Sequence, residues 1–431
     1  MIRIKTTIPG PKSKKLLEKF KRLNGGWSVP HPTILTMRGE RCYVEDVDGN
    51  RFLDFGSQIA TNPLGYNHEA LLENSQRYAN RSPIKIAGQD FPTQEHIDLL
   101  EELLTIAPKG LNGAFLINSG AEATENAVKI ALRQRPQAKI GISCEGAFHG
   151  RTLGALSNTN SKQVHKKHFF SLPVRRIPYD ESAVDHLNQL TKRELSPQEI
   201  GYVIIEPIQG EGGYNIPSKK TIQSIRTWCE RNNVPFISDE VQMGMGRTGT
   251  WWAIEQFNVT PDIITAAKAL QVGAVIAKRS SFPEPGSISS TWGGGHLLDL
   301  ANALTTIKTI KKDNLLESNK KHGKSLLLLL QELASKHPSM SNIRGLGLLA
   351  AFDLPTRKDR DNLILELLKR GVIVLGAGEK SVRIIPPFVV NNHDLVAFID
   401  ALDKALHTVI KKSFKHRGHI CKYIDCSRSV S

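Results

Sequence analysis

Three polar sites in the sequence directly follow short apolar runs that have the composition of β-strands. Gly120 and Ala121 come after the run GAFLI and open a segment with a helical pattern. Asp239 ends the run PFIS, and Lys268 follows the run PDIITAA. Ligands bind outside the carboxyl ends of the strands in an open α/β sheet, so we expect the three sites to face one pocket.

Each site has a chemical use, and each by itself also has an ordinary structural explanation. Free backbone N–H groups at a helix N-terminus attract phosphate, although a glycine before a helix often serves only the turn. An acid at a strand end, such as Asp239, can bind a metal, cap a helix or pair with a protonated ring nitrogen. A desolvated lysine becomes nucleophilic, whereas a lysine beside an apolar run can also simply extend its amine to solvent.

In combination the three sites predict one cofactor. A phosphate cradle at Gly120 and Ala121, a carboxylate at Asp239 and an amine at Lys268 match a pyridine ring that carries a phosphate and an aldehyde. The carboxylate would keep the ring nitrogen protonated, and the lysine would capture the aldehyde as a Schiff base. The sequence therefore predicts pyridoxal 5'-phosphate as the cofactor and Lys268 as the catalytic residue.

The elements that must position these residues are predicted by the hydrophobic pattern. From about residue 100 to 310, β-branched runs alternate with helical segments, which is typical of an α/β fold with a mainly parallel sheet covered on both faces. The later segments predict a smaller α+β domain. We expect an N-terminal part of the small domain in residues 1–57, a large cofactor-binding domain in 58–311, the C-terminal part of the small domain in 312–410 and a basic, disordered tail in 411–431.

Two local patterns support structure near the N-terminus. Residues 11–24 predict an amphipathic helix with Leu16, Leu17 and Phe20 on one side, ended by Gly25 and Gly26. After it, the dipeptide Asp48-Gly49 lies between two apolar runs, which indicates a β-hairpin.

The composition fits an intracellular globular protein. The 431 residues carry a net charge of +15, but residues 1–23 and 411–431 account for +12 of it, so no basic nucleic-acid groove is expected in the body of the chain. No apolar run is long enough for a membrane span, and the N-terminus has no signal-peptide core, so we expect no membrane partner and a cytoplasmic location. The five scattered cysteines predict neither a disulfide framework nor a metal site, and the Cys421 and Cys426 region fits no zinc spacing.

Several longer motifs resemble those of class III aminotransferases of fold type I. They are NSGAEATENAVK, GAFHGRTLGALS, IIEPIQGEGG, SDEVQMGMGRTG and the Lys268 segment, and the resemblance extends over roughly residues 8–408. Within this class the sequence is most similar to 4-aminobutyrate aminotransferases of the animal type and to lysine 6-aminotransferases. The stretches VDGNRFLDFGSQIATNPLGYNH, STWGG and GVIVLGAGEKSVRIIPP carry that finer similarity.

The resemblance implies further cofactor contacts. Phe148 would stack on the pyridine ring, Val241 would meet its other face, and Gln242 would approach its phenolic oxygen. Thr291 of STWGG would reach the phosphate from a neighbouring subunit, which implies a homodimer with shared active sites.

The resemblance also implies how substrates bind. Arg151 would bind a carboxylate remote from the reacting amine, and Arg383 an α-carboxylate, because the planar guanidinium accepts a carboxylate in a bidentate manner. Glu211 would pair with Arg383 while an ω-amine reacts and move away when 2-oxoglutarate arrives. Ile59 lies in a stretch that resembles the substrate pocket and favours a short donor. These implications predict ping-pong transfer of an amino group from 4-aminobutyrate to 2-oxoglutarate.

Some departures from the family pattern leave alternatives open. The run that starts at Asn118 lacks the cysteines that bind an iron–sulfur cluster in animal 4-aminobutyrate enzymes, so no cluster is expected. Ala269 and Ile385 differ from the residues usual in close relatives and leave the donor open between 4-aminobutyrate, lysine and ornithine. An amino-acid racemase of the same fold and a non-catalytic basic binding protein are the alternatives from other classes.

Overall fold

The computed structural model describes residues 1–26, 30–82 and 84–411, and divides the chain into two compact units. One unit comprises Met1–His68 together with Lys320–Ser431, and the other comprises Glu69–Asn319. The predicted tail, including Cys421 and Cys426, lies almost wholly outside the described residues. Among the described residues, no helix is both long enough and apolar enough to cross a bilayer.

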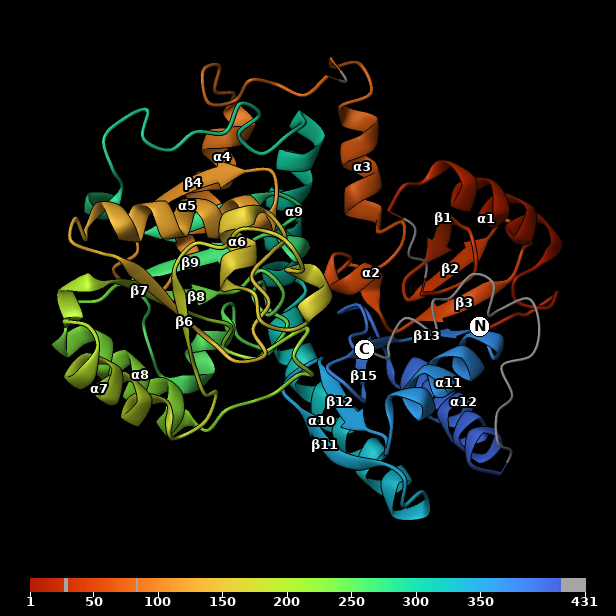
Figure 1. The fold of residues 1–431 in the computed structure, drawn as a ribbon. Helices are drawn as coiled ribbons and strands as arrows, with labels where there is room; N and C mark the ends of the chain where they lie inside the picture. The colour runs from red at the N-terminus through yellow and green to blue at the C-terminus, as the bar shows by residue number, and fades with distance from the viewer. Residues whose placement is uncertain (27–29, 83, 412–431) are drawn as a thin grey trace. The chain divides into compact units, whose positions relative to one another are not determined.

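The unit of residues 69–319 is built on a seven-stranded sheet with the strand order β4-β10-β9-β8-β7-β5-β6 (Figure 1). The strands are β4 (Gly113–Ile117), β5 (Ile140–Cys144), β6 (Val174–Ile177), β7 (Ile200–Ile205), β8 (Phe236–Asp239), β9 (Ile263–Ala266) and β10 (Gly273–Ala277). All neighbours pair in parallel except β10, which is antiparallel to both β4 and β9. The predicted α/β class with a mainly parallel sheet is therefore confirmed.

This pairing places the carboxyl ends of six strands at one edge of the sheet. Strands β9, β8, β7, β5 and β6 run in one direction, and β4 shares it because two antiparallel steps through β10 restore the direction. The loops that follow β4, β5, β7, β8 and β9 therefore emerge together. They carry the predicted residues from Gly120 to Lys268.

The helices of this unit pack on the sheet through apolar faces. They are α3 (Glu69–Arg77), α4 (Gln94–Thr105), α5 (Gly120–Arg133), α6 (Leu153–Asn158), α7 (Ala183–Arg193), α8 (Lys219–Arg231) and α9 (Leu297–Lys312). Helix α5 buries Ala123, Ala127 and Ile130 against Ile204 of β7 and Ile263 of β9 in one cluster. Because α5 is fixed on the sheet in this way, its N-terminus is held at the same edge as the loops.

The other unit contains two four-stranded sheets, β1-β2-β3-β13 and β11-β12-β15-β14. Its strands are β1 (Leu35–Glu40), β2 (Tyr43–Asp46), β3 (Arg51–Asp54), β11 (Ser341–Gly345), β12 (Ala350–Asp353), β13 (Val372–Ile373), β14 (Leu375–Ala377) and β15 (Ser381–Ile384). Its helices are α1 (Pro11–Leu23), α2 (Ser57–Ala60), α11 (Arg357–Lys369), α12 (Asn392–Lys411) and most of α10 (Leu315–Lys336). Helix α11 packs on strands of both sheets and on α12 (Figure 1).

Two boundaries of the predicted domains differ from the units. Residues 58–68 stay with the first unit because Arg41 and Tyr66 form a β-bridge and Phe388 donates a backbone hydrogen bond to Pro63. The second boundary falls inside α10, where the side chain of Asn319 donates to the backbone oxygen of Gly246 (2.9 Å). Neither link is visible as a change in composition.

The N-terminal patterns are present with one correction. Strands β2 and β3 pair as the predicted hairpin, and Gly49 has the positive φ of 79° that its turn requires. Helix α1 spans Pro11–Leu23, but Leu16 and Phe20 are exposed, and only Leu17 of the predicted apolar side is buried, with Ser13 one turn earlier. The buried face follows the i, i+4 row of Ser13 and Leu17.

Candidate active site

The phosphate cradle is predicted at the N-terminus of α5 (Gly120–Arg133). Ser119 is its N-cap, and its side chain accepts a hydrogen bond from the backbone N–H of Glu122 (3.2 Å). Gly120 is the first residue of the helix and leaves room where a side chain would collide. A Cβ on Gly120 would lie 2.6 Å from Cγ1 of Val241 and 3.5 Å from Cβ of Ala267. The loops after β4, β8 and β9 therefore meet at this glycine, and Lys268 is the next residue after Ala267.

Asp239 is buried at the end of β8 and held from three directions. Oδ1 accepts hydrogen bonds from the backbone N–H of Val241 (3.1 Å) and from the hydroxyl of Thr265 (3.2 Å), and Oδ2 lies 2.7 Å from Nδ1 of His149. Facing a carboxylate, Nδ1 of His149 is the protonated nitrogen. These bonds fix the orientation of the carboxylate while each oxygen keeps accepting capacity for a further N–H donor.

Lys268 begins the 3-10 turn η4 (Lys268–Leu270) directly after β9. Its side chain is partly buried, and its neighbours Ala267 and Ala269 are nearly fully buried. The turn is closed by Gln271, which has a left-handed φ of 68° and donates its backbone N–H to the oxygen of Lys268 (3.0 Å). The amine thus starts from a fixed backbone position at the carboxyl edge of the sheet.

The loop after β5 places an aromatic ring and a guanidinium together. Cζ of Arg151 lies 5.8 Å from the ring centroid of Phe148, within the range of a cation–π contact, and the Arg151 side chain is exposed. The ring of His165 meets Phe148 edge-on, with the centroids 5.8 Å apart. Burial lowers the pKa of His165, and the charges of Arg151 and Lys162 lower it further.

The loop after β7 carries Glu211 and Glu206. Glu206 is buried and accepts backbone hydrogen bonds from Phe148 and Gly210 (both 2.9 Å), so one carboxyl group joins the Phe148 loop to the Glu211 loop. Burial raises the pKa of Glu206 to about 7; the charge of Asp239 contributes to the rise, and that of His149 opposes it. Glu211 forms an ion pair with Lys162 (3.2 Å), and Gln242 accepts a hydrogen bond from Tyr214 (3.1 Å).

Three predicted residues, Thr291, Arg383 and Ile59, lie outside the loops described so far. Thr291 is exposed, next to Ser290, whose hydroxyl accepts a hydrogen bond from the side chain of Asn118 (2.9 Å). Arg383 and Ile59 belong to the unit that begins at Met1. Arg383 is buried in β15 with 4% of its surface exposed, whereas Ile59 is 45% exposed.

Ile59 lies in an unusual turn. The four residues of α2, from Ser57 to Ala60, all have positive φ values of 47° to 66°, and none is glycine. The buried carboxylate of Asp54 accepts the backbone N–H groups of Gly56 (2.8 Å) and Ser57 (2.9 Å) and so supports the turn. The short motif around Ile59 gave no sign of this conformation.

Four residues that the sequence reasoning did not assign lie against the predicted ones: His149, Glu206, Lys162 and Asp54. His149 could have been noticed, because it directly follows Phe148. Glu206 could also have been noticed, because it directly follows an apolar run. Lys162 and Asp54 carried no such signal, because their partners are 49 residues away or are backbone groups.

Comparison with known proteins decides the family. A family model described as aminotransferase class-III matches residues 26–406. The chain belongs to the class III aminotransferases. Its fold is therefore that of fold type I enzymes, its cofactor is pyridoxal 5'-phosphate, and its substrates are an amino compound and a keto acid.

The similar class III aminotransferases differ in the substrates that they are named for. The chain is 31% identical to mitochondrial 4-aminobutyrate aminotransferase of Mus musculus over 92% of this chain and 89% of that protein. It is 34% identical to acetylornithine aminotransferase of Prochlorococcus marinus over 90% of this chain and 92% of that one. A solved structure of lysine aminotransferase from M. tuberculosis aligns with a TM-score of 0.87 at 31% identity, over 92% of this chain and 99% of the other.

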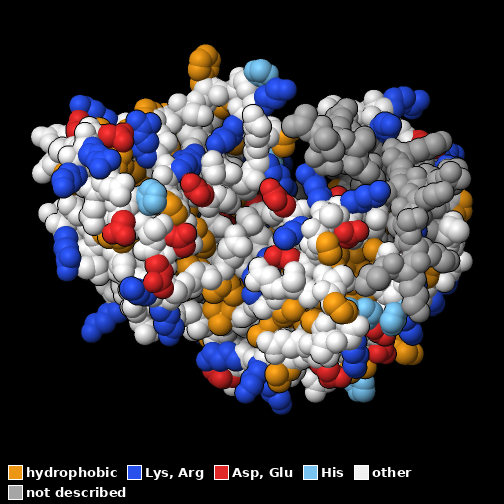
Figure 2. Space-filling view, turned by 60° about the horizontal axis from the view of Figure 1, so that its bottom comes forward, with side chains coloured by type: hydrophobic (Ala, Val, Ile, Leu, Met, Phe, Trp, Pro, Cys, Tyr) orange, Lys and Arg blue, Asp and Glu red, His pale blue; other side chains and the backbone are white. Residues whose placement is uncertain are grey.

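On the face drawn in Figure 2, Lys and Arg side chains are scattered and interspersed with Asp and Glu, rather than gathered in one basic patch. The described cysteines Cys42, Cys144 and Cys229 are buried and free. The cytoplasmic location stays a prediction.

Proposed function

We propose that this aminotransferase moves the terminal amino group of an ω-amino acid, with 4-aminobutyrate preferred, to 2-oxoglutarate. The observation that supports the proposal is that Gly120 lies against Val241 and Ala267, so the proposed phosphate cradle and the proposed ring contact are next to the residue that precedes Lys268. When bound there, pyridoxal phosphate supplies an electron-withdrawing ring that stabilises negative charge on the reacting carbon.

Individual residues of the chain would bind the cofactor and transfer the proton. The first N–H groups of α5, at Gly120 and Ala121, would bind the phosphate, and Asp239 would hold the proton on the ring nitrogen. His149 positions Asp239. Phe148 and Val241 would lie against the two faces of the ring, with Gln242 near its phenolic oxygen. In the first half of the cycle the Lys268 amine would take a proton from the carbon that bears the reacting amine and pass it to the cofactor. In the second half it would move a proton in the opposite sense, from the cofactor to the carbon of the keto acid.

Arg151 favours a donor whose carboxylate lies far from its amine. Its exposed guanidinium beside Phe148 can bind a carboxylate at the rim of the ring site. We assign the α-carboxylate of 2-oxoglutarate to Arg383 and the donor chain to Ile59. Lys162 already offsets the charge of Glu211, which favours a donor without a second ammonium group.

We further propose a homodimer in which Thr291 serves the partner's site. Thr291 is exposed beside Trp292 (46% exposed), and Phe91 (72%) and Ile84 (67%) are also exposed. The segment of Thr291 is tied to that of Phe91, since Ser290 donates to Gln89 (2.5 Å) and His96 is bonded to the oxygen of Gly293 (3.0 Å). Large apolar side chains exposed on segments that are bonded to each other are typical of a subunit interface.

The test is a spectral titration of the purified enzyme. The visible absorption band of the lysine-bound cofactor is recorded while 4-aminobutyrate, lysine or ornithine is added without a keto acid. We expect 4-aminobutyrate to abolish the band at the lowest concentration and 2-oxoglutarate to restore it. Lys268→Ala should lack both the band and turnover, and Arg151→Ala should raise the KM for 4-aminobutyrate at least about tenfold.

Lysine is the second candidate donor, because a lysine aminotransferase is among the similar structures. A lower KM for lysine than for 4-aminobutyrate would replace the preferred donor and leave the aminotransferase assignment intact. A band that no ω-amine changes would contradict the proposed function as a whole.

A further inference from the structure

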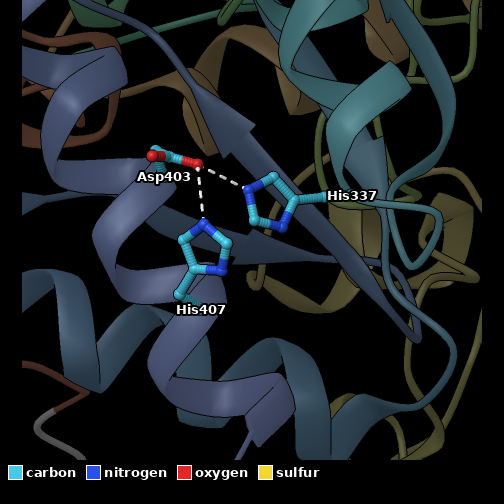
Figure 3. A group of neighbouring side chains, drawn as sticks. All are labelled: His337, Asp403 and His407. Atoms are coloured by element: carbon cyan, nitrogen blue, oxygen red, sulfur yellow. Dashed lines mark hydrogen bonds and ion pairs between the residues drawn. The ribbon is translucent and has the colours of Figure 1, made fainter.

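Three side chains in the unit that begins at Met1 bring metal-ligating atoms together (Figure 3). His337 directly follows helix α10, and Asp403 and His407 lie one turn apart on α12. Nε2 of His337 is 2.6 Å from Oδ1 of Asp403, and Nε2 of His407 is 3.6 Å from the same oxygen. One ligand atom from each residue lies within 4.8 Å of those from the other two.

The types of these ligands select a class of metal ion. Two imidazoles and one carboxylate suit zinc and other divalent transition metals, whereas calcium and magnesium prefer sites made only of oxygen ligands. Three protein ligands leave a fourth position of a tetrahedral zinc site for water. We propose that His337, Asp403 and His407 bind a divalent ion of the zinc class and so join the end of α10 to α12.

The spacing is close to that of a loaded site. With bonds of roughly 2.0–2.1 Å to the metal, tetrahedral ligands lie about 3.3 Å from one another. The Nε2 atoms of His337 and His407 already lie 2.6 and 3.6 Å from Oδ1 of Asp403, so each of these two distances needs to change by less than about 1 Å.

The three ligands differ in how firmly their side chains are held. The side chain of His337 is 3% exposed and held in place, whereas those of Asp403 (40%) and His407 (54%) are free to adjust from the solvent side. A metal ion would replace the hydrogen bond between His337 and Asp403 and approach from the exposed side of His407. The buried imidazole fixes the site, and the two ligands on α12 close it.

The charges around the cluster permit a cation. Asp403 supplies one negative charge, and the adjacent Lys336 is paired with Glu332 (3.0 Å). The alternative is that Asp403 serves only as the hydrogen-bond partner of His337 and the ion-pair partner of His407. That alternative gives no metal affinity above that of any exposed histidine.

The experiment is a calorimetric titration of the full-length holoenzyme with zinc chloride. All proteins carry His416→Ala, His419→Ala, Cys421→Ser and Cys426→Ser, so that these side chains cannot bind the probe. We expect one equivalent of zinc to bind and to raise Tm by several degrees. His407→Ala and Asp403→Asn should each weaken binding at least about tenfold.

The matched control is His393→Ala, which removes another exposed histidine from the same helix, α12. It should bind zinc as its parent does. His407 is exposed, so its loss leaves the fold intact and a loss of binding reports the site itself. Binding that His407→Ala and His393→Ala change equally, or an absence of stoichiometric binding in the parent, would overturn the proposal.

Discussion

Replacing Gly120 tests the meeting of three loops at the proposed phosphate site. In Gly120→Ala the new Cβ would lie 2.6 and 3.1 Å from the two Cγ atoms of Val241. Ordinary carbon contacts are about 3.5–4.0 Å, so Val241 must withdraw by about 1 Å. Val241 is β-branched and has few rotamers, and Asp239 accepts its backbone N–H, so it cannot yield freely.

The expected cost follows from overpacking. Forcing one extra methyl group into a filled site costs about 1–3 kcal/mol, and the better helix propensity of alanine returns less than about 1 kcal/mol. We expect Gly120→Ala to bind pyridoxal phosphate about 5- to 50-fold more weakly, measured by equilibrium dialysis of the cofactor-free protein. The Tm of that cofactor-free protein should also fall.

Val241→Ala is the second substitution of a double-mutant cycle, because it removes both Cγ atoms that the new Cβ would meet. The double variant should bind the cofactor more tightly than the sum of the two single losses predicts, with a coupling of about 1–2 kcal/mol. Gly25→Ala is the control, since a Cβ there would meet nothing within 4 Å. Strict additivity of Gly120→Ala and Val241→Ala would refute the predicted contact.

Three further outcomes are expected. Asp239→Asn should retain cofactor by absorbance but lose about 100-fold or more in kcat, because the charge beside the ring nitrogen is removed; unchanged kcat would exclude the assigned role. Because burial raises the pKa of Glu206 from 4.5 to about 7, its ionisation opposes folding, and its contribution to the unfolding free energy should fall by roughly 3 kcal/mol as pH rises from about 4.5 to 7. Denaturant titrations at pH 5 and 8 should show this fall in the parent protein and not in Glu206→Gln. An equal change in unfolding free energy between the two pH values in both proteins would contradict the assignment. Asp54→Ala should lower the unfolding free energy by about 2–4 kcal/mol and raise the KM for the donor, since it frees the backbone N–H groups of a turn with positive φ; a KM that stays the same would separate the turn from substrate binding.

The sequence by itself determined the class of the large sheet and the order of its chemical groups. The runs before Gly120, Asp239 and Lys268 are apolar on both faces, and such strands fit only a sheet covered on both sides. In a parallel sheet the residues after the strands share one edge, so position along the chain was enough to group them. Strands β6 and β10 were not predicted, because β6 is partly exposed at the edge and β10 lies close behind the Lys268 turn without a separating helix.

Only the tertiary structure decided which side chains support these groups. His149 bonds to Asp239 across 90 residues, and His337 meets Asp403 across 66. No local period links such pairs, because their separation is set by strand order and helix packing rather than by spacing along the chain. The left-handed turn of Ile59 also depends on tertiary structure. Its four non-glycine residues with positive φ follow the buried Asp54 carboxylate, which accepts the backbone N–H groups of Gly56, Ser57 and Gln58.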